Sequence, residues 1–331
     1  MLVKQITILG LGQIGASIGL ALAGKGQFVR VGHDSEPGQA RRAEKMGAVD
    51  KASGNLYRAV EKADVIVLAM PLDQVRVTLA LIARDLKPGV VIMDTAPVKA
   101  AVEEWIRQVL PQGCSYIGLT PVVNPLYLLE RQRGIDAARP DLFHKGVFAI
   151  VTPFYVPPDA LNLATEFASW LGAEHMFTDV VEIDGLMAAV HILPQLLSAA
   201  LLQATIGEPG WKEGRKLAGR SYAQVAEPMI SADDPTALAY ATVFNAENIH
   251  RLLGAMITIL EDWRDDLAEG DHTLLEERFT RLRDDYLHWL QDRGAANWAA
   301  RELSPSQGMP SSTEWLGRLI GIRPRKRNKP D

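Results

Sequence analysis

The stretch ITILGLGQIG, residues 6–15, decides the fold of this chain. A short β-favouring run leads into a G-x-G-x-x-G turn, and an apolar helical pattern follows the turn. This order of strand, glycine turn and helix is the setting in which the pattern binds a dinucleotide. Gly10 permits a tight turn, Gly12 lets the backbone approach a pyrophosphate, and Gly15 lets the helix pack against the strand. We therefore expect a Rossmann domain at the start of the chain.

The second strand pattern indicates which dinucleotide is bound. The run of residues 28–33 ends at Asp34, whose carboxylate can accept both ribose hydroxyls of NAD and would repel the 2′-phosphate of NADP. Arg41 and Arg42 follow closely, so NADP stays open as an alternative. The N-terminus of the first helix offers free N–H groups to the phosphates. The residues expected to contact the cofactor are Gly10, Gly12, Gln13, Ile14, Gly15 and Asp34.

The chain divides into a strand-rich part and a helical part. Over the first 178 residues, β-rich runs at 6–9, 28–32, 65–69, 90–94, 115–118 and 147–151 alternate with helical patterns at 13–25, 36–46, 72–84, 98–109 and 158–172. This alternation predicts βαβ units and an α/β fold with a doubly wound, mostly parallel sheet. Long helical patterns follow at 179–206, 236–267 and 273–290, the first with a kink expected near Pro194. We predict a Rossmann domain over 1–178, an all-α substrate and dimerisation domain over 179–300, and a linker, short helix and basic tail over 301–331.

Composition and charge narrow the class of protein. The 331 residues carry a net charge of −5 and a single cysteine, Cys114. Neither nucleic acid nor an anionic membrane is therefore an expected partner, and we expect no disulfide and no metal site. The N-terminal residues lack a secretory pattern, so we expect a cytoplasmic enzyme. The apolar run 186–202 is shorter than the roughly 20 residues of a membrane span, and we expect a buried helix covered by a second subunit.

Several later segments, taken in order, resemble the prephenate/arogenate dehydrogenase family. Ala69-Met70-Pro71 resembles the family's loop beside the nicotinamide, DTAPVK at 94–99 resembles its D-x-x-S-V-K segment, and residues 183–194 resemble its H-D…S-H-L-P helix. The resemblance implies that Met70 and Pro71 also contact the cofactor and that the protein is a homodimer with intertwined helical domains. It implies an oxidative decarboxylation of a cyclohexadienyl acid on the route to tyrosine.

The chain departs from that family at the positions that handle the substrate. Thr120 stands where the family has a histidine, and Pro97 stands where it has a serine. Ile192 occupies a second histidine position, with His191 one residue earlier, and Glu227 falls where a substrate-binding arginine is expected. The first histidine would accept the proton of the substrate hydroxyl, and the arginine would pair with a carboxylate. We therefore expect an altered substrate site.

His191 is the first candidate for catalysis. It shares one predicted helical face with Asp184 and Gln195, at offsets of 0, 7 and 11 residues. This stripe either faces the nicotinamide cleft or holds a histidine whose hydrogen bonds are satisfied in the core or at an interface. Both interpretations remain open at this point.

Three further residues are candidates. Lys99 opens a helix beside a sheet-end loop, where it either holds a substrate carboxylate or is solvated. Asn245 matches the family and either orients the substrate or closes an interhelical hydrogen bond, and Thr120 is a weaker candidate. The main hypothesis is an NAD(P)-dependent dehydrogenase of a small carboxylated substrate. The alternatives are a non-catalytic NAD-binding dimer with a regulatory role and a reductase of another small carboxylated substrate.

Overall fold

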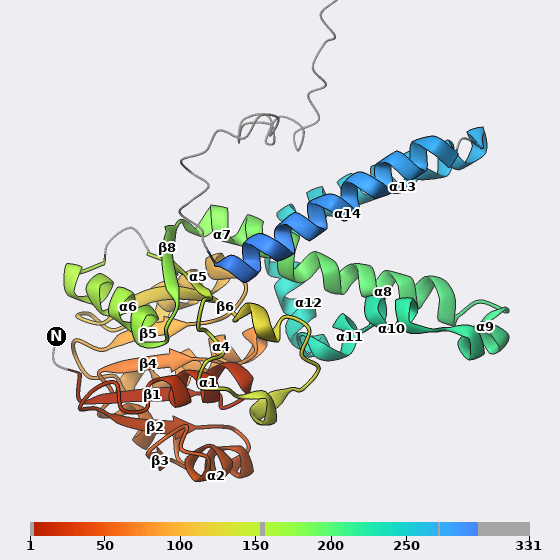
Figure 1. Ribbon diagram of the computed structural model, residues 1–331. Helices are drawn as coiled ribbons and strands as arrows, with labels where there is room; N and C mark the ends of the chain where they lie inside the picture. The colour runs from red at the N-terminus through yellow and green to blue at the C-terminus, as the bar shows by residue number, and fades with distance from the viewer. Residues whose placement is uncertain (1–2, 153–155, 271, 297–331) are drawn as a thin grey trace, which may run out of the picture. The chain divides into compact units, whose positions relative to one another are not determined.

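The computed structural model of the protein describes residues 3–152, 156–270 and 272–296 (Figure 1). The linker, short helix and basic tail expected beyond residue 300 lie outside the described residues. The chain forms two compact units, which divide between Leu252 and Leu253. The first unit contains the whole sheet, and the helices that follow the last strand belong to the same unit as far as Leu252. The domain boundary near residue 178 stays a prediction.

An eight-stranded sheet forms the centre of the first unit (Figure 1). The strand order is β3-β2-β1-β4-β5-β6-β7-β8, and all neighbours are parallel except β6 and β7. The strands are β1 (Gln5–Leu9), β2 (Val29–His33), β3 (Lys51–Ala52), β4 (Val65–Leu68), β5 (Val91–Asp94), β6 (Ser115–Val122), β7 (Val147–Val151) and β8 (Glu174–Thr178). The mostly parallel Rossmann sheet is therefore confirmed.

The central strands are apolar because helices cover both of their faces. Every residue of β4 and β5 is buried, including Asp94 at the end of β5. Such strands give continuous apolar runs in the sequence. Two strands were not predicted: β3 has only two residues, and β8 is a mostly exposed edge strand with the polar sequence EHMFT. Neither presents the run of buried apolar residues on which the prediction rests.

The helices of the Rossmann part follow the strands as expected. They are α1 (Gln13–Ala21), α2 (Pro37–Lys45), α3 (Leu56–Val60), α4 (Leu72–Ile82), α5 (Lys99–Val109) and α6 (Pro158–Trp170), with 3₁₀ turns at η1 (Ala83–Asp85), η2 (Pro125–Tyr127) and η3 (Gly134–Ala137). The short α3 was not predicted. It begins at Asn55, whose side chain accepts a hydrogen bond from the Arg58 N–H and so caps the helix.

The first long helix of the helical part is interrupted where the sequence predicts a kink. It consists of α7 (Val180–Met187), a π-helical turn η4 (Ala188–Ile192) and α8 (Leu193–Ile206). Pro194 lies in the first turn of α8 and has no N–H to donate, so the wider turn precedes it. The segment 180–206 is long and apolar enough to cross a membrane by length and composition, which alone is weak evidence. Only 22% of its most apolar 18-residue stretch is buried. The rest of the described chain therefore does not cover this helix.

The second long helix was predicted wrongly as continuous over 236–267. It is divided into α12 (Pro235–Phe244) and α13 (Ala246–Glu269), because Asn245 leaves the helical conformation with φ −117° and ψ 30°. The short helices α9 (Trp211–Leu217), α10 (Arg220–Ala226) and α11 (Pro228–Ser231) were not predicted. The last predicted helix is α14 (His272–Ala295).

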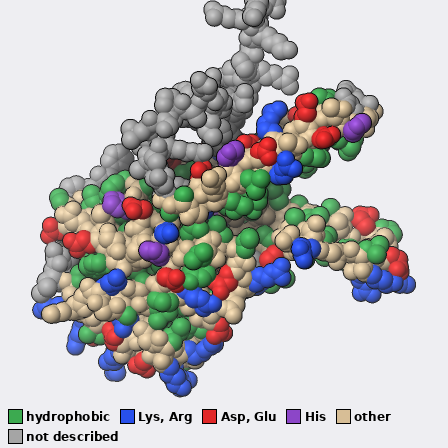
Figure 2. Space-filling model, in the orientation of Figure 1, with side chains coloured by type: hydrophobic (Ala, Val, Ile, Leu, Met, Phe, Trp, Pro, Cys, Tyr) green, Lys and Arg blue, Asp and Glu red, His purple; other side chains and the backbone are tan. Residues whose placement is uncertain are grey.

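Apolar side chains remain exposed on the helices of the second unit (Figure 2). Within this unit, Trp263 of α13 packs edge-to-face on Phe279 of α14, with ring centroids 5.8 Å apart. Phe279 and Trp289 still expose 51% and 48% of their surface. An apolar face of this kind commonly marks an interaction surface.

Candidate functional site

The glycine turn borders a cavity at the carboxyl ends of β1, β2 and β4. The cavity has a volume of about 410 Å³. Of the predicted cofactor contacts, it is lined by Gly10, Gly12, Asp34, Met70 and Pro71. The other three, Gln13, Ile14 and Gly15, form the first turn of α1, directly after the glycine turn. The carboxyl ends of parallel strands are where such sheets bind ligands.

The three glycines serve different needs. A Cβ on Gly10 would lie 2.3 Å from the Ala69 carbonyl oxygen, and its φ of +89° favours glycine. A Cβ on Gly15 would lie 1.9 Å from the Gly10 carbonyl oxygen. A Cβ on Gly12 would meet nothing within 4 Å, and its φ of −72° suits any residue. The fold therefore requires Gly10 and Gly15, whereas Gly12 keeps open a space that a pyrophosphate can approach.

Asp34 directly follows β2 and lies beside the glycine turn, at the β2 end of the cavity. Its Oδ2 accepts a hydrogen bond from the Leu11 N–H at 2.7 Å, and its Oδ1 accepts one from the Glu36 N–H at 2.9 Å. Glu36 also lines the cavity, whereas neither Arg41 nor Arg42 does. Two carboxylates and no arginine at this end suit a ribose with free hydroxyls and disfavour a 2′-phosphate. The residues present therefore fit a dinucleotide of the NAD type.

The structure corrects the prediction for Lys99, which was expected either to hold a substrate carboxylate or to be solvated. Its side chain is 1% exposed, and its Nζ contacts Asp94 Oδ2 at 2.5 Å. The same Nζ donates to the carbonyl oxygens of Ala96 and Leu119 at 2.8 and 2.9 Å. Burial lowers the pKa of Lys99, and the adjacent Asp94 carboxylate opposes that effect. Because its donors are directed at protein acceptors, Lys99 joins α5 to the end of β5 and to the middle of β6.

Asp184 and Asn245 extend this buried network into the helices. The Asp184 carboxylate accepts hydrogen bonds from the N–H groups of Lys99 and Ala100, at 2.6 and 3.0 Å, and so caps α5. Asn245 Nδ2 donates to the Asp184 carbonyl oxygen at 2.7 Å. For Asn245, the structure therefore contains the interhelical hydrogen bond that was one of its two predicted roles. The network attaches α7 and the end of α12 to the start of α5 and, through Lys99, to the end of β5.

Thr120 lies on β6 and is 3% exposed. Its Oγ1 is buried, and no hydrogen-bond partner for it is found among the described residues. The neighbouring Leu119 carbonyl oxygen is bound by Lys99. The hydroxyl is therefore close in sequence to the buried network without taking part in it, and its predicted role in catalysis stays a prediction.

His191 is paired with a carboxylate that the sequence analysis did not identify. Its Nε2 lies 2.8 Å from Asp233 Oδ2, and Gln195 Nε2 donates to the same oxygen at 3.2 Å. Gln195 Oε1 in turn accepts the Asp233 N–H at 3.2 Å. The predicted stripe is therefore only partly formed: His191 and Gln195 meet at Asp233, whereas Asp184 contacts α5. The wider π-helical turn between them changes the helical register.

A second pair that was not predicted joins a loop to the short helices. Arg133, just before η3, forms an ion pair with Glu227, with Nη2 and Oε1 3.5 Å apart. The adjacent η3 lies against the start of α1, where Gln13 Nε2 donates to the Ala137 carbonyl oxygen at 3.3 Å. Arg133 is thus on a loop anchored beside the glycine turn. No periodic pattern surrounds Arg133 or Asp233, and only tertiary contacts could have identified them.

Comparison with known proteins gives consistent matches. The family described as prephenate dehydrogenase, nucleotide-binding domain, matches residues 18–177. The prephenate dehydrogenase of Lactococcus lactis is 29% identical over 205 residues, which are 60% of this chain and only 53% of that protein. The cyclohexadienyl dehydrogenase of Zymomonas mobilis is 24% identical over 283 residues, which are 83% of this chain and 92% of that protein.

Solved structures share the fold. The arogenate dehydrogenase of Synechocystis has a TM-score of 0.67 at 23% identity, with 86% of this chain and all (100%) of that chain covered. The prephenate dehydrogenase of A. aeolicus, in complex with hydroxyphenyl propionate and NAD⁺, has a TM-score of 0.75 at 16% identity, with 87% and 99% covered. At these identities the likeness concerns the fold.

Proposed function

Because this chain belongs to the prephenate/arogenate dehydrogenase family, we propose that it is an NAD-dependent dehydrogenase of a carboxylated cyclohexadienyl acid. One observation carries the proposal: the space beside Gly12 is open, although the fold would tolerate a side chain there. That space lies in the cavity that Asp34 also lines. The substrate site differs from that expected of the family, so the exact acid is part of the proposal.

The Rossmann part holds the cofactor. The backbone at Gly12 and the first turn of α1 would face the pyrophosphate, and Asp34 would accept the ribose hydroxyls. Met70 and Pro71 would form the wall beside the nicotinamide. When bound, NAD supplies an acceptor for the hydride that leaves the hydroxyl-bearing ring carbon.

The pair of His191 and Asp233 would handle the proton. As that carbon is oxidised, its hydroxyl must lose a proton, and a neutral imidazole can accept it. Burial raises the pKa of Asp233, but hydrogen bonds from His191 and Gln195 outweigh burial and bring the pKa below its usual 3.8. Asp233 therefore stays ionised at neutral pH, orients the imidazole and stabilises its protonated form. Loss of carbon dioxide then leaves its electron pair in the ring, which becomes aromatic.

Arg133 would bind the substrate carboxylate. The position where the resemblance leads us to expect an arginine carries Glu227, whose negative charge would repel that group. Glu227 is instead paired with Arg133, at a distance well beyond the 2.7–2.9 Å typical of a charge-assisted hydrogen bond. The Arg133 side chain is 40% exposed, and a guanidinium group has five N–H donors. It can therefore contact a substrate carboxylate in addition to Glu227.

The test is NADH formation by the full-length protein. Absorbance at 340 nm would be followed with prephenate, arogenate and related cyclic acids, first with NAD and then with NADP. We expect turnover of at least one acid, with NAD preferred. An Arg133→Met variant should raise KM, and a matched Arg131→Met variant on the same loop should not. Tight NAD binding without turnover of any acid would contradict the dehydrogenase and favour a non-catalytic regulatory dimer. Oxidation of NAD(P)H with a keto acid would favour a reductase.

Homodimerisation through the helical regions is part of the proposal. Apolar side chains are exposed to solvent on the α7–α8 segment, where Val190 is 69% exposed, and on one face of α14. Obligate homodimers bury large apolar interfaces of this kind. Sedimentation velocity across a hundredfold range of concentration should give a dimer throughout. A monomer at all concentrations would contradict it.

A further inference from the structure

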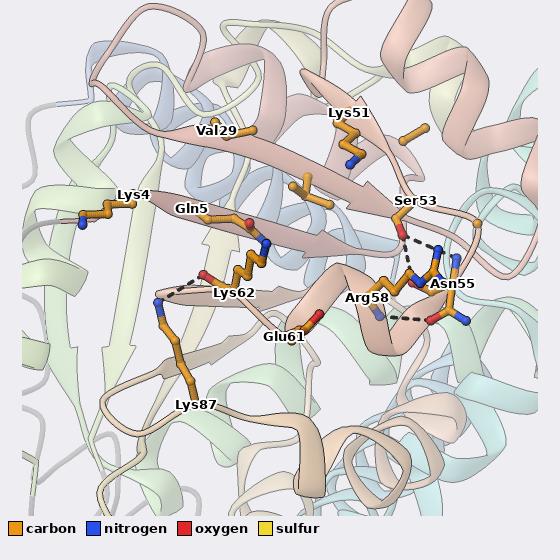
Figure 3. Close-up of a pocket in the computed structure, with 13 residues that line it drawn as sticks. Lys4, Gln5, Val29, Lys51, Ser53, Asn55, Arg58, Glu61, Lys62 and Lys87 are labelled. Atoms are coloured by element: carbon orange, nitrogen blue, oxygen red, sulfur yellow. Dashed lines mark hydrogen bonds between the residues drawn. The ribbon is translucent and has the colours of Figure 1, made fainter.

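We propose that a groove on the outer part of the sheet binds a small polyanion, meaning a molecule with two or more phosphate or carboxylate groups. The groove has a volume of about 960 Å³ and runs beside β1, β2, β3 and α3 (Figure 3). The charged side chains that line it are Lys4, Lys51, Arg58, Lys62, Lys87 and Glu61. Five cations and one carboxylate thus meet in one groove of a chain whose net charge is −5.

Most of this positive charge is not neutralised by the protein. Lys87 is an exception, because its Nζ lies 2.5 Å from Asp64 Oδ1 and donates to the Lys62 carbonyl oxygen. The ion pairs formed by the described residues include none with Lys4, Lys51, Arg58 or Lys62. A concave surface lined by charge of one sign raises the local concentration of oppositely charged ligands.

The groove lies where the start of β2 meets β3 and the five-residue helix α3. Val29, the first residue of β2, is 48% exposed in the groove, whereas the next three residues of the strand are buried. Lys51 comes from β3 and Arg58 from α3, so their side chains approach the groove from two different elements (Figure 3). Cations on opposite sides of an apolar floor can contact separate anionic groups of one ligand.

The groove is distinct from the dinucleotide cavity. Lys4 and Gln5 lie at the start of β1, whereas the glycine turn follows the end of that strand. The two cavities share no lining residue, although α3 contributes Leu56 to one and Arg58 to the other. The proposal therefore does not depend on the proposed dehydrogenase activity.

A ligand with several charges is required because each exposed ion pair contributes little. Each exposed pair changes an affinity by about fivefold at most and is screened by salt. A single phosphate would touch one or two of these side chains. A tripolyphosphate or a tricarboxylate carries several charges and can contact more than one of these side chains, and its affinity should fall as salt is added.

Calorimetric titration of the full-length protein with tripolyphosphate, and separately with citrate, tests the proposal. Saturating NAD is present throughout, so that the probe cannot occupy the pyrophosphate site. We expect binding of tripolyphosphate, citrate or both, and the pattern tells phosphate from carboxylate recognition. A Lys51→Glu/Arg58→Glu variant should bind the probe at least about tenfold more weakly than the unaltered protein. The control is a Lys25→Glu/Lys45→Glu variant, which has the same charge change outside the groove. Its affinity for the probe should stay within about twofold of that of the unaltered protein.

Two results would overturn the proposal. One is the absence of binding of both probes at millimolar concentration and low salt. The other is equal weakening by the groove variant and its control, which would indicate attraction to the net charge alone. Unfolding temperatures of both variants show whether the fold is kept. A milder Lys51→Gln/Arg58→Gln variant replaces the charge reversal if it is not, and should weaken binding by a smaller factor.

Discussion

Replacement of Lys99 by methionine tests the buried network that joins α5 to the sheet. The ammonium lies 2.5 Å from Asp94 Oδ2, and the two side chains are 1% and 0% exposed. Methionine keeps most of the lysine side chain's apolar length and removes its charge. The Asp94 carboxylate would then remain buried with two neutral donors, the Tyr116 hydroxyl and the Ala96 N–H.

The expected magnitude follows from this arrangement. Removing one partner of a buried ion pair typically costs about 3–5 kcal/mol of stability, because the other charge is left without compensation. Two donors still bind Asp94, so we expect the lower end, about 3 kcal/mol. Adding Asp94→Asn removes the uncompensated charge. The double variant should therefore recover at least about 1 kcal/mol relative to the sum of the two single variants.

Urea unfolding followed by circular dichroism and tryptophan fluorescence measures these free energies. Arg107→Met, at an exposed position on the same helix, is the control and should change stability by no more than about 0.5 kcal/mol. A loss below about 1 kcal/mol for Lys99→Met would refute the reasoning, and so would strict additivity in the double variant.

Three further predictions concern packing, catalysis and pH. Gly15→Ala would place a Cβ 1.9 Å from a backbone carbonyl oxygen, so thermal unfolding should show a loss of about 1–3 kcal/mol, and an unchanged unfolding temperature would contradict the assigned packing role. In the NADH-formation assay with the accepted substrate, His191→Gln should lower kcat about 10²-fold, and Asp233→Asn should lower it by a smaller factor. Full activity of the His191→Gln variant would exclude His191 as the base. The hydrogen bond from the Arg30 side chain lowers the pKa of Asp50 in the folded protein below its usual 3.8. The ionised carboxylate therefore stabilises the fold above pH 3.8, and this stabilisation is lost as the pH falls through the pKa of the folded state. Urea titrations should therefore show Asp50→Asn less stable than the unaltered protein at pH 7, with a gap that narrows below pH 4; a gap independent of pH would count against this ion pair.

The Rossmann part could be predicted because its chemistry is local. Buried parallel strands give continuous apolar runs, and the glycine turn has fixed spacing. The sheet could therefore be predicted, and so could five of the residues that line the cavity beside the glycine turn. The break at Asn245 did not, because the apolar pattern continues across it. Its side chain is held by the Asp184 carbonyl oxygen, a contact between residues 61 positions apart. Propensity alone does not register such a tertiary hydrogen bond.

The substrate side of the site could be predicted only in part. His191 was identified because a histidine is unusual on an apolar helix, but its partner Asp233 lies 42 positions away in a segment without periodicity. Lys99 was assigned to substrate or solvent because it opens a helix just past a sheet-end loop, where ligands bind. Its burial depends on Asp94 and the carbonyl groups that converge on it, which only the folded chain brings together.

Titration of NAD into the unaltered protein and into a Gly12→Ala variant tests the central claim most directly. The added Cβ meets no protein atom within 4 Å, so the variant should fold with an unchanged unfolding temperature. The methyl group would occupy the space that the pyrophosphate approaches, so the affinity for NAD should fall about tenfold or more. Equal affinity of the two proteins for NAD would contradict the assignment of the glycine turn as the dinucleotide site.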